Sequence, residues 1–220
     1  MLSKSPRRFS FGGIAMAKFH LLASTILIVT AAAPPAAPTE PTLDQVRAAA
    51  EKYKDVKLAL EDGYVPDPSG MCETAAMMGK PAKLGAMGIH YARPDLLGIT
   101  APPNPRVDGT GTYTDFNKPA ILLYEPQTDG SLKLVGVENL VFAKAWHAAG
   151  HKQPPTFHGI RFDHMIDNPA TKIDEAHNFM PHYDRHVWVF RDNPNGVFAQ
   201  YNPNVSCSAA KPTSMPAMHK

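Results

Sequence analysis

Apolar residues recur at helical spacing between positions 42 and 63. They are Leu43, Val46, Ala49, Ala50, Tyr53, Val56 and Leu60. Charged residues largely occupy the opposite side of the helix that this spacing describes. Thr42, with Gln45 three positions later, is typical of a capping box, and Gly63 suits a left-handed helix end. The pattern predicts one amphipathic helix whose apolar side packs against the core.

Short apolar runs separated by turn residues replace the helical pattern after residue 64. Five of them predict strands, at 86–91, 120–125, 132–142, 185–191 and 197–201. The segments 127–130 (Gln-Thr-Asp-Gly) and 192–196 (Asp-Asn-Pro-Asn-Gly) have turn residues, and predict hairpins between the second and third strands and between the last two. We therefore expect an α+β fold, in which one N-terminal amphipathic helix precedes a mainly antiparallel β-sheet or small barrel with long Pro-rich loops.

The first 33 residues follow a third pattern, in which basic residues precede an apolar run and a group of small residues. This is the layout of a secretory signal peptide. The apolar run at 21–33 has 13 residues, fewer than the roughly 18 to 20 that span a bilayer as a helix. We expect cleavage and export to the periplasm or the medium, with no stable membrane insertion afterwards. Arg7 and Arg8 resemble an imperfect twin-arginine signal, and Met16 is a second candidate start beside Met1.

Composition divides the rest of the chain. Residues 34–41 read as a Pro-rich linker, residues 42–207 as a single globular domain and residues 208–220 as a flexible tail. Hydrophobic residues at 44% and charged residues at 19% allow a sizeable core, while 22 prolines predict many ordered loops. Of the 22 basic and 20 acidic residues, four basic and no acidic ones lie in positions 1–33, which leaves a net charge of −2. A near-neutral domain without a basic stripe argues against nucleic acid and anionic membrane as partners.

The chain contains two cysteines, Cys72 and Cys207. In an exported protein two cysteines usually form a disulfide, because the compartment is oxidising. A loop this long would stabilise the fold by about 4 to 5 kcal/mol in the chain-entropy description. We then expect no nucleophilic cysteine chemistry. The chain also lacks a Gly-x-Ser-x-Gly elbow, a phosphate loop, a His-Glu-x-x-His motif and a dinucleotide fingerprint.

Two of the predicted strands place polar side chains on apolar faces. Alternation along 132–142 puts Glu138 on the face of Leu132, Leu134, Gly136 and Leu140. Alternation along 185–191 puts His186 on the face of Trp188 and Phe190. A buried carboxylate costs several kcal/mol unless it is paired, so Glu138 needs a partner inside the domain.

His90, His182 and His186 are the candidate partners of Glu138. Imidazoles with one carboxylate form a usual ligand set for zinc, copper, iron or manganese, so these four residues predict a divalent transition-metal site. In the alternative interpretation, each histidine donates to a backbone carbonyl and Glu138 pairs with Arg161 or Arg185. The methionines around Cys72, together with Met87, Met215 and Met218, would suit Cu(I), but methionine is also an ordinary core residue.

Two further functions are compatible with the pattern. Tyr91, Trp188, Phe190 and Phe198 could line an apolar pocket for a small molecule without any metal. The domain could also be a structural or interaction protein of the cell envelope. Whether the protein is an enzyme does not follow from these residues.

Several sequence blocks resemble a family of uncharacterised exported bacterial proteins. They are GAMGIHY at 85–91, LLYEP at 122–126, HYDRHVW at 182–188 and NPNVSC at 202–207, with further blocks at 59–66, 134–138 and 193–196. The resemblance covers nearly the whole chain after the leader and implies export, but brings no assigned reaction. Arg185 stands where the resemblance leads us to expect leucine.

Overall fold

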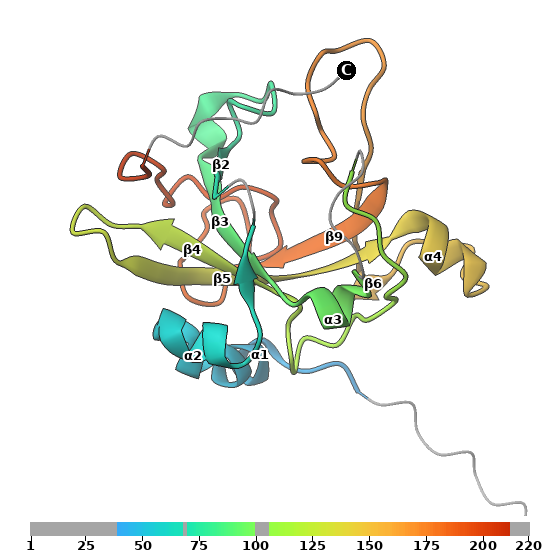
Figure 1. The fold of residues 1–220 in the computed structure, drawn as a ribbon, viewed down its shortest axis with the longest axis horizontal. Coiled ribbons are helices and arrows are strands. Elements are labelled where there is room, and N and C mark those ends of the chain that lie inside the picture. Colours follow the sequence, from blue (N-terminus) through green and yellow to red (C-terminus); the bar gives the residue numbers. More distant parts are fainter. Residues whose placement is uncertain (1–38, 68–69, 100–105, 212–220) are drawn as a thin grey trace, which may run out of the picture. The chain divides into compact units, whose positions relative to one another are not determined.

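The computed structural model describes residues 39–67, 70–99 and 106–211 (Figure 1). The predicted signal peptide, most of the predicted linker, the methionines of the tail and the rest of the tail beyond residue 211 lie outside the described residues. Within the described ranges, no helix is long and apolar enough to cross a membrane.

The N-terminal amphipathic segment is helical but forms three pieces instead of one helix. They are α1 (Leu43–Ala50), the 3-10 helix η1 (Glu51–Lys54) and α2 (Val56–Glu61). The break falls at Asp55, whose backbone is extended and whose side chain accepts a hydrogen bond from the backbone N–H of Lys57. Aspartate competes with helical hydrogen bonding in this way, and so begins a new helix instead of continuing the old one.

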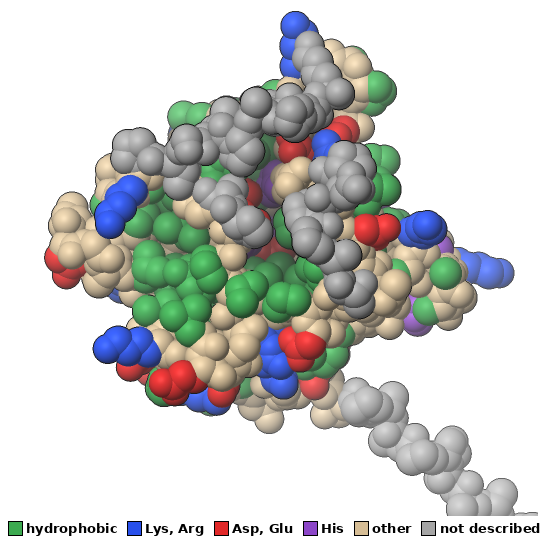
Figure 2. All heavy atoms as spheres, in the orientation of Figure 1, with side chains coloured by type: hydrophobic (Ala, Val, Ile, Leu, Met, Phe, Trp, Pro, Cys, Tyr) green, Lys and Arg blue, Asp and Glu red, His purple; other side chains and the backbone are tan. Residues whose placement is uncertain are grey.

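Both predicted ends of the segment are confirmed. The side chain of Thr42 accepts from the backbone of Gln45, whose side chain accepts from the backbone of Thr42 in return. Gly63 has a φ of +89° and follows Asp62, the residue that caps the end of α2. In Figure 2, charged side chains line the outer side of the helical segment, while hydrophobic side chains gather over the neighbouring strands β4 and β5. Val46, Ala50 and Tyr53 of the segment are buried, so the segment is amphipathic, as the spacing predicts.

A mainly antiparallel sheet forms the centre of the domain, which confirms the α+β class. Its strands lie in the order β1, β3, β4, β5, β9, β8, with β2 paired to β3. Their bounds are β1 (Val65–Pro66), β2 (Cys72–Thr74), β3 (Ala86–Ala92), β4 (Ile121–Pro126), β5 (Leu132–Phe142), β8 (Asp163–Met165) and β9 (His182–Val187). The sheet is open, so the barrel alternative is wrong. The hairpin predicted at 127–130 joins β4 to β5, with Gly130 at a φ of +84°.

The end of the chain departs from the prediction. Strand β9 covers His182–Val187 and stops before Trp188, and residues 197–201 form turns instead of a strand. The predicted second hairpin is therefore wrong. One backbone bond remains, from the N–H of Trp188 to the carbonyl of Val197 at 2.9 Å. Side-chain donors supplement it: Trp188 Nε1 donates to the carbonyl of Ala199 at 2.6 Å, and Arg185 Nη1 donates to that of Phe198 at 2.7 Å. Asn202 donates to the carbonyls of residues 191 and 192 in the same manner.

The remaining elements are short, and the hydrophobic pattern did not predict them. They are η2 (Ala82–Leu84), α3 (Pro94–Leu97), α4 (Ala143–Ala148), β6 (Thr156–Phe157) and β7 (Ile160–Arg161), in addition to β1, β2 and β8. Elements of two to six residues span too few turns or repeats for periodicity to show. Strands β6 and β7 form a separate two-stranded sheet.

Each face of the sheet carries its own apolar core. Leu122 and Tyr124 of β4 point to the face covered by the N-terminal helices, where they pack with Val46 and Tyr53. Leu123 points to the opposite face, whose buried residues include Ile121, Val135, Leu140, Phe142 and Trp188. The polar site described below lies on this second face, within a shell of apolar residues.

A bulge in β5 corrects the predicted faces of that strand. Leu123 pairs with Gly136 but Tyr124 pairs with Leu134, which leaves Val135 as an extra residue. Leu134 therefore packs on the helix-covered face, not on the face of Glu138. The extra residue exchanges the two faces for every side chain on one side of the bulge. A strict period-2 assignment along the sequence cannot predict that exchange.

Candidate metal centre

The two cysteines form a disulfide, as predicted. Cys72 lies in β2, which pairs with β3, and Cys207 lies near the end of the described chain. The bond ties residues 135 positions apart. It fixes the short strand β2, whose three residues form few backbone bonds, beside the strand that carries His90.

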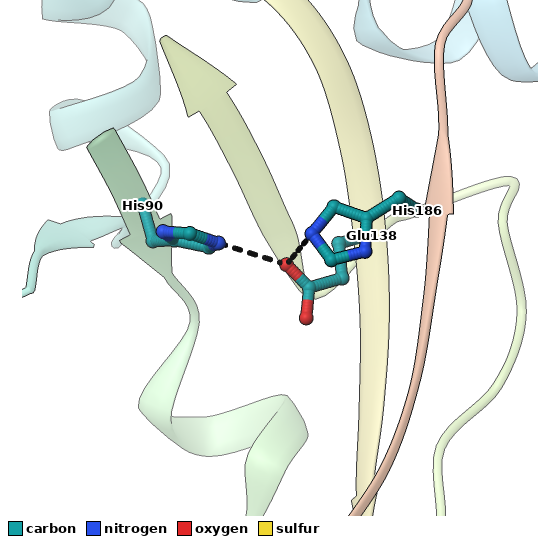
Figure 3. Close-up of side chains that lie close together, drawn as sticks. All are labelled: His90, Glu138 and His186. Atoms are coloured by element: carbon teal, nitrogen blue, oxygen red, sulfur yellow. Dashed lines mark ion pairs between the residues drawn. The ribbon is translucent and has the colours of Figure 1, made fainter. Parts of the chain in front are cut away.

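Three of the four predicted ligands meet above the second face of the sheet (Figure 3). Glu138 of β5 lies directly opposite His186 of β9 in the antiparallel register, so both side chains point to the same face. His90 of β3 reaches the carboxylate from the other side, across β4, where it pairs with Leu123. Three strands separated widely in sequence thus each contribute one side chain.

The contacts among these side chains are close and buried. Glu138 Oε2 lies 3.3 Å from His90 Nε2 and 3.5 Å from His186 Nε2. The three ligand atoms all lie within 4.8 Å of one another. The side chains of Glu138 and His186 are 3% and 1% exposed, whereas that of His90 is 15% exposed. His90 is therefore the most exposed of the three side chains.

Several buried atoms of the cluster lack hydrogen bonds. Among the described residues, Glu138 Oε2 and both ring nitrogens of His186 have no partner with hydrogen-bond geometry. Buried polar atoms in proteins are nearly always satisfied, and each exception needs a reason. Ligand atoms that face one common point, instead of facing one another, provide such a reason.

His182 shares the face of His186 but stays outside the group. Its Nδ1 donates to the carbonyl of Met180 at 3.0 Å, and its Nε2 lies 3.9 Å from Asp184 Oδ2. Burial lowers the pKa of His182 to about 4, which keeps the imidazole neutral. Burial and the charge of Glu138 raise the pKa of Asp184 well above its usual range. For His182, the interpretation as a carbonyl-bonded histidine is therefore the one that fits.

The arginine alternative for Glu138 is wrong. Arg185 directly precedes His186 on β9, so its side chain points to the other face of the sheet. In the antiparallel register Arg185 lies opposite Asn139, not opposite Glu138. It donates to the carbonyls of Arg161 and Phe198, and lies 3.4 Å from Asp163. Within the described ranges, the ion pairs of Glu138 are those with His90 and His186.

The charges of the cluster follow from burial and from the neighbours. Burial alone would raise the pKa of Glu138, but His186 and His90 outweigh it and lower that pKa. Burial lowers the pKa of His186, so this imidazole is neutral. Burial would also lower the pKa of His90, but Glu73 and Glu138 raise it to about 9. The metal-free cluster therefore holds one imidazolium, one neutral imidazole and one carboxylate.

A second carboxylate and imidazole, which the hydrophobic pattern did not predict, lie beside this cluster. Glu73 Oε2 is 2.8 Å from His177 Nδ1, and both side chains are about nine-tenths buried. Burial would raise the pKa of Glu73, but His177 and His90 lower it to about 2. Glu73 belongs to a three-residue strand and His177 to a loop, so neither gives a periodic signal. For Glu73, the one signal in the sequence was its position next to Cys72, which the disulfide holds inside the domain.

The aromatic-pocket hypothesis does not fit the fold. Trp188 packs on the second face, over Gly136 and near the ring of His186. Tyr91, Phe190 and Phe198 pack against the core on the opposite face. The four rings therefore line no common pocket. The copper hypothesis also loses support, because Met87 is fully buried in an apolar cluster with Ala75 and Tyr201.

Comparison with protein-family models, with curated proteins and with solved structures finds no match for this chain. The family resemblance of the sequence blocks therefore stays a prediction. The function has to be argued from the site itself.

Proposed function

We propose that this domain binds one divalent transition-metal ion through Nε2 of His90, a carboxylate oxygen of Glu138 and Nε2 of His186. The observation that supports the proposal is the convergence of three ligand atoms from three different strands, of which Glu138 Oε2 and His186 Nε2 are buried without a hydrogen-bond partner among the described residues. Two imidazoles and one carboxylate are a ligand set that zinc and non-haem iron both accept.

The spacing of the ligand atoms favours zinc. Ligands about 2.0 to 2.1 Å from a tetrahedral zinc ion lie roughly 3.3 to 3.4 Å apart, whereas ligands at right angles on the same bonds lie roughly 2.9 Å apart. The contacts of Glu138 with the two histidines are 3.3 and 3.5 Å. These two distances match the tetrahedral spacing, the distance between the two histidine ligand atoms is below 4.8 Å, and three protein ligands would leave a fourth position for a small molecule.

Charge also supports a cation here. Glu138 is 3% exposed, and a buried carboxylate is costly unless a nearby positive charge compensates it. In the metal-free protein the His90 imidazolium provides that charge. A divalent ion would replace the proton of His90 and compensate the carboxylate more fully.

Metal content and affinity test this proposal. The protein is purified without a His tag, stripped with chelator and titrated with zinc, with elemental analysis of the untreated sample. We expect one zinc per chain, and at least a 100-fold loss of affinity for Glu138→Gln and for His186→Gln. His164→Gln is the matched control, because His164 is an exposed histidine outside the cluster. A folded wild-type protein that takes up no zinc, copper, iron or manganese would refute the proposal.

We further infer that the domain works outside the cytoplasm. The disulfide between Cys72 and Cys207 supports this, because such bonds persist in oxidising compartments. The predicted signal peptide agrees with it. Fractionation of cells that express the full chain, followed by immunoblotting, tests the location.

A further inference from the structure

Two short strands hold the outer edge of β3 beside His90. β1 has two residues, and β2 has three, with a register shift before the third. The backbone N–H of Asp67, which directly follows β1, donates to the carbonyl of His90 at 2.9 Å. The other two ligands lie on β5 and β9, and every residue of β9 pairs with β5. His90 is therefore the ligand whose strand has the weaker support on one edge.

The disulfide reaches this edge next to His90. Cys72 is the first residue of β2 and pairs with Ile89, which directly precedes His90 on β3 (Figure 1). Cys72 and the next residue of β2, Glu73, are both buried. The bond from Cys72 to Cys207 thus adds a covalent tether to a strand that forms few backbone hydrogen bonds of its own.

The segment that leads to Cys207 is held without the disulfide. Asn202 and Ala86 exchange two backbone hydrogen bonds, of 3.0 and 3.2 Å, and the side chain of Asn202 donates to two further carbonyls. The backbone N–H of Ser206 donates to the carboxylate of Glu125 at 2.9 Å. Breaking the disulfide would therefore release β2 and leave the segment 202–206 in place.

We propose that the disulfide between Cys72 and Cys207 controls the metal affinity of the domain, so that the oxidised protein holds the ion and reduction of the bond releases it. This inference rests on the proposed metal site. Ligands bind a metal tightly when their geometry is fixed before the ion arrives. Once β2 is released, metal binding has to order the edge of β3 again, and this cost weakens the affinity.

The redox step takes a dithiol as the reductant. One thiolate of the dithiol attacks the sulfur of Cys207, and the thiolate of Cys72 leaves. The second thiolate of the dithiol then attacks the reductant's own sulfur in the mixed disulfide, and the thiolate of Cys207 leaves. Two electrons pass to the protein. The dithiol becomes a disulfide, and each cysteine thiolate takes up one of the two protons that the dithiol gave up.

Global stabilisation is the competing explanation. A bond between residues 135 positions apart stabilises a fold largely by restricting the unfolded chain. In that case the disulfide changes how much of the protein is folded, but not the affinity of the folded protein for zinc. The two explanations therefore differ in the dissociation constant of zinc, measured on folded protein.

The zinc affinity of a folded variant without the disulfide tests the inference. The double substitution Cys72→Ser/Cys207→Ser in the full chain removes the bond and leaves no thiol that binds zinc itself. Ordering the backbone of one residue changes an equilibrium by roughly 5- to 30-fold. We expect zinc to bind the double variant more weakly than wild type by about this factor at pH 7.5, with far-UV circular dichroism showing that the variant is folded.

Val46→Ala is the matched control. Val46 is fully buried in the core on the helix-covered face, opposite the face of the ligand cluster. Its truncation lowers the free energy of unfolding and leaves β2 and the disulfide in place. We expect this variant to bind zinc with wild-type affinity, which separates a loss of global stability from the release of β2.

Each outcome decides between the hypotheses. If the folded double variant binds zinc with wild-type affinity, the redox inference is wrong and the metal site stands. If the wild type binds no metal, both fail. If the double variant does not fold, zinc-loaded wild type is reduced with a phosphine, and zinc release to a coloured chelator is followed together with far-UV circular dichroism. Zinc release before the loss of the folded signal supports the inference, and simultaneous changes overturn it.

Discussion

Zinc binding should release one proton from His90, and this makes the affinity strongly dependent on pH. In the metal-free protein, Glu73 and Glu138 raise the pKa of His90 to about 9, against a usual value of 6.5. Burial keeps His186 neutral, so that residue has no proton to give. A metal ion coordinates only the deprotonated imidazole, and therefore competes with the proton on His90.

The magnitude follows from the position of that pKa. Below pH 9 the fraction of deprotonated His90 changes about tenfold per pH unit. Between pH 6.5 and 8.5, zinc affinity should therefore rise by a little under 100-fold and then level off above pH 9. A histidine with its ordinary pKa of 6.5 would give a rise of only about twofold over the same range.

Isothermal titration calorimetry with a zinc–nitrilotriacetate buffer measures the zinc affinity at each pH and the number of protons released per zinc. Repeating the titration at pH 7.5 in buffers of different ionisation enthalpy counts the protons, and we expect close to one per zinc in the wild-type protein. His164→Gln, which alters an exposed histidine, serves as the control. An affinity that is flat from pH 7 to 8.5, or a count near zero, would refute the assignment of His90 as a protonated ligand.

Four further results are expected. The raised pKa of His90 stabilises the metal-free fold below pH 6.5 by about 3 kcal/mol, and this stabilisation is lost as the pH rises through about 9. Denaturant unfolding of the wild type and of His90→Gln at pH 6 and pH 10 measures the difference in unfolding free energy. The lowered pKa of Glu73 stabilises the fold above its usual pKa of 4.5, and this is lost as pH falls toward 2, so Glu73→Gln should flatten the acid limb of the stability curve. Replacing Cys72 and Cys207 with serine should cost about 4 to 5 kcal/mol and abolish the effect of reductant on Tm; stoichiometric free thiol in the native protein would contradict the bond. Intact mass of the exported protein should place its start between about residues 33 and 39, and retention of residues 21–29 would contradict cleavage.

Local periodicity was sufficient where an element is long. The predicted strand at 132–142 has the same bounds in the structure, and the predicted strand at 86–91 is one residue short of β3. Both segments are apolar runs bounded by turn residues, and that signal is enough to predict a strand even where a bulge breaks the alternation. The segment 185–191 failed because the strand ends at Val187 and the chain is then held by the side chains of Arg185 and Trp188 instead of by strand pairing.

The sequence by itself determined the α+β class, the pairing of the two cysteines, and the presence of Glu138 and His186 on otherwise apolar strand faces. Each of these follows from residue type, count or local alternation. The tertiary structure decided that His90 joins these two residues and that His182 does not, because the choice depends on strand order and on the bond between His182 and Met180. It also brought His177 from a loop to Glu73 in a three-residue strand. Such a contact depends on how distant segments pack together, and no local pattern records that.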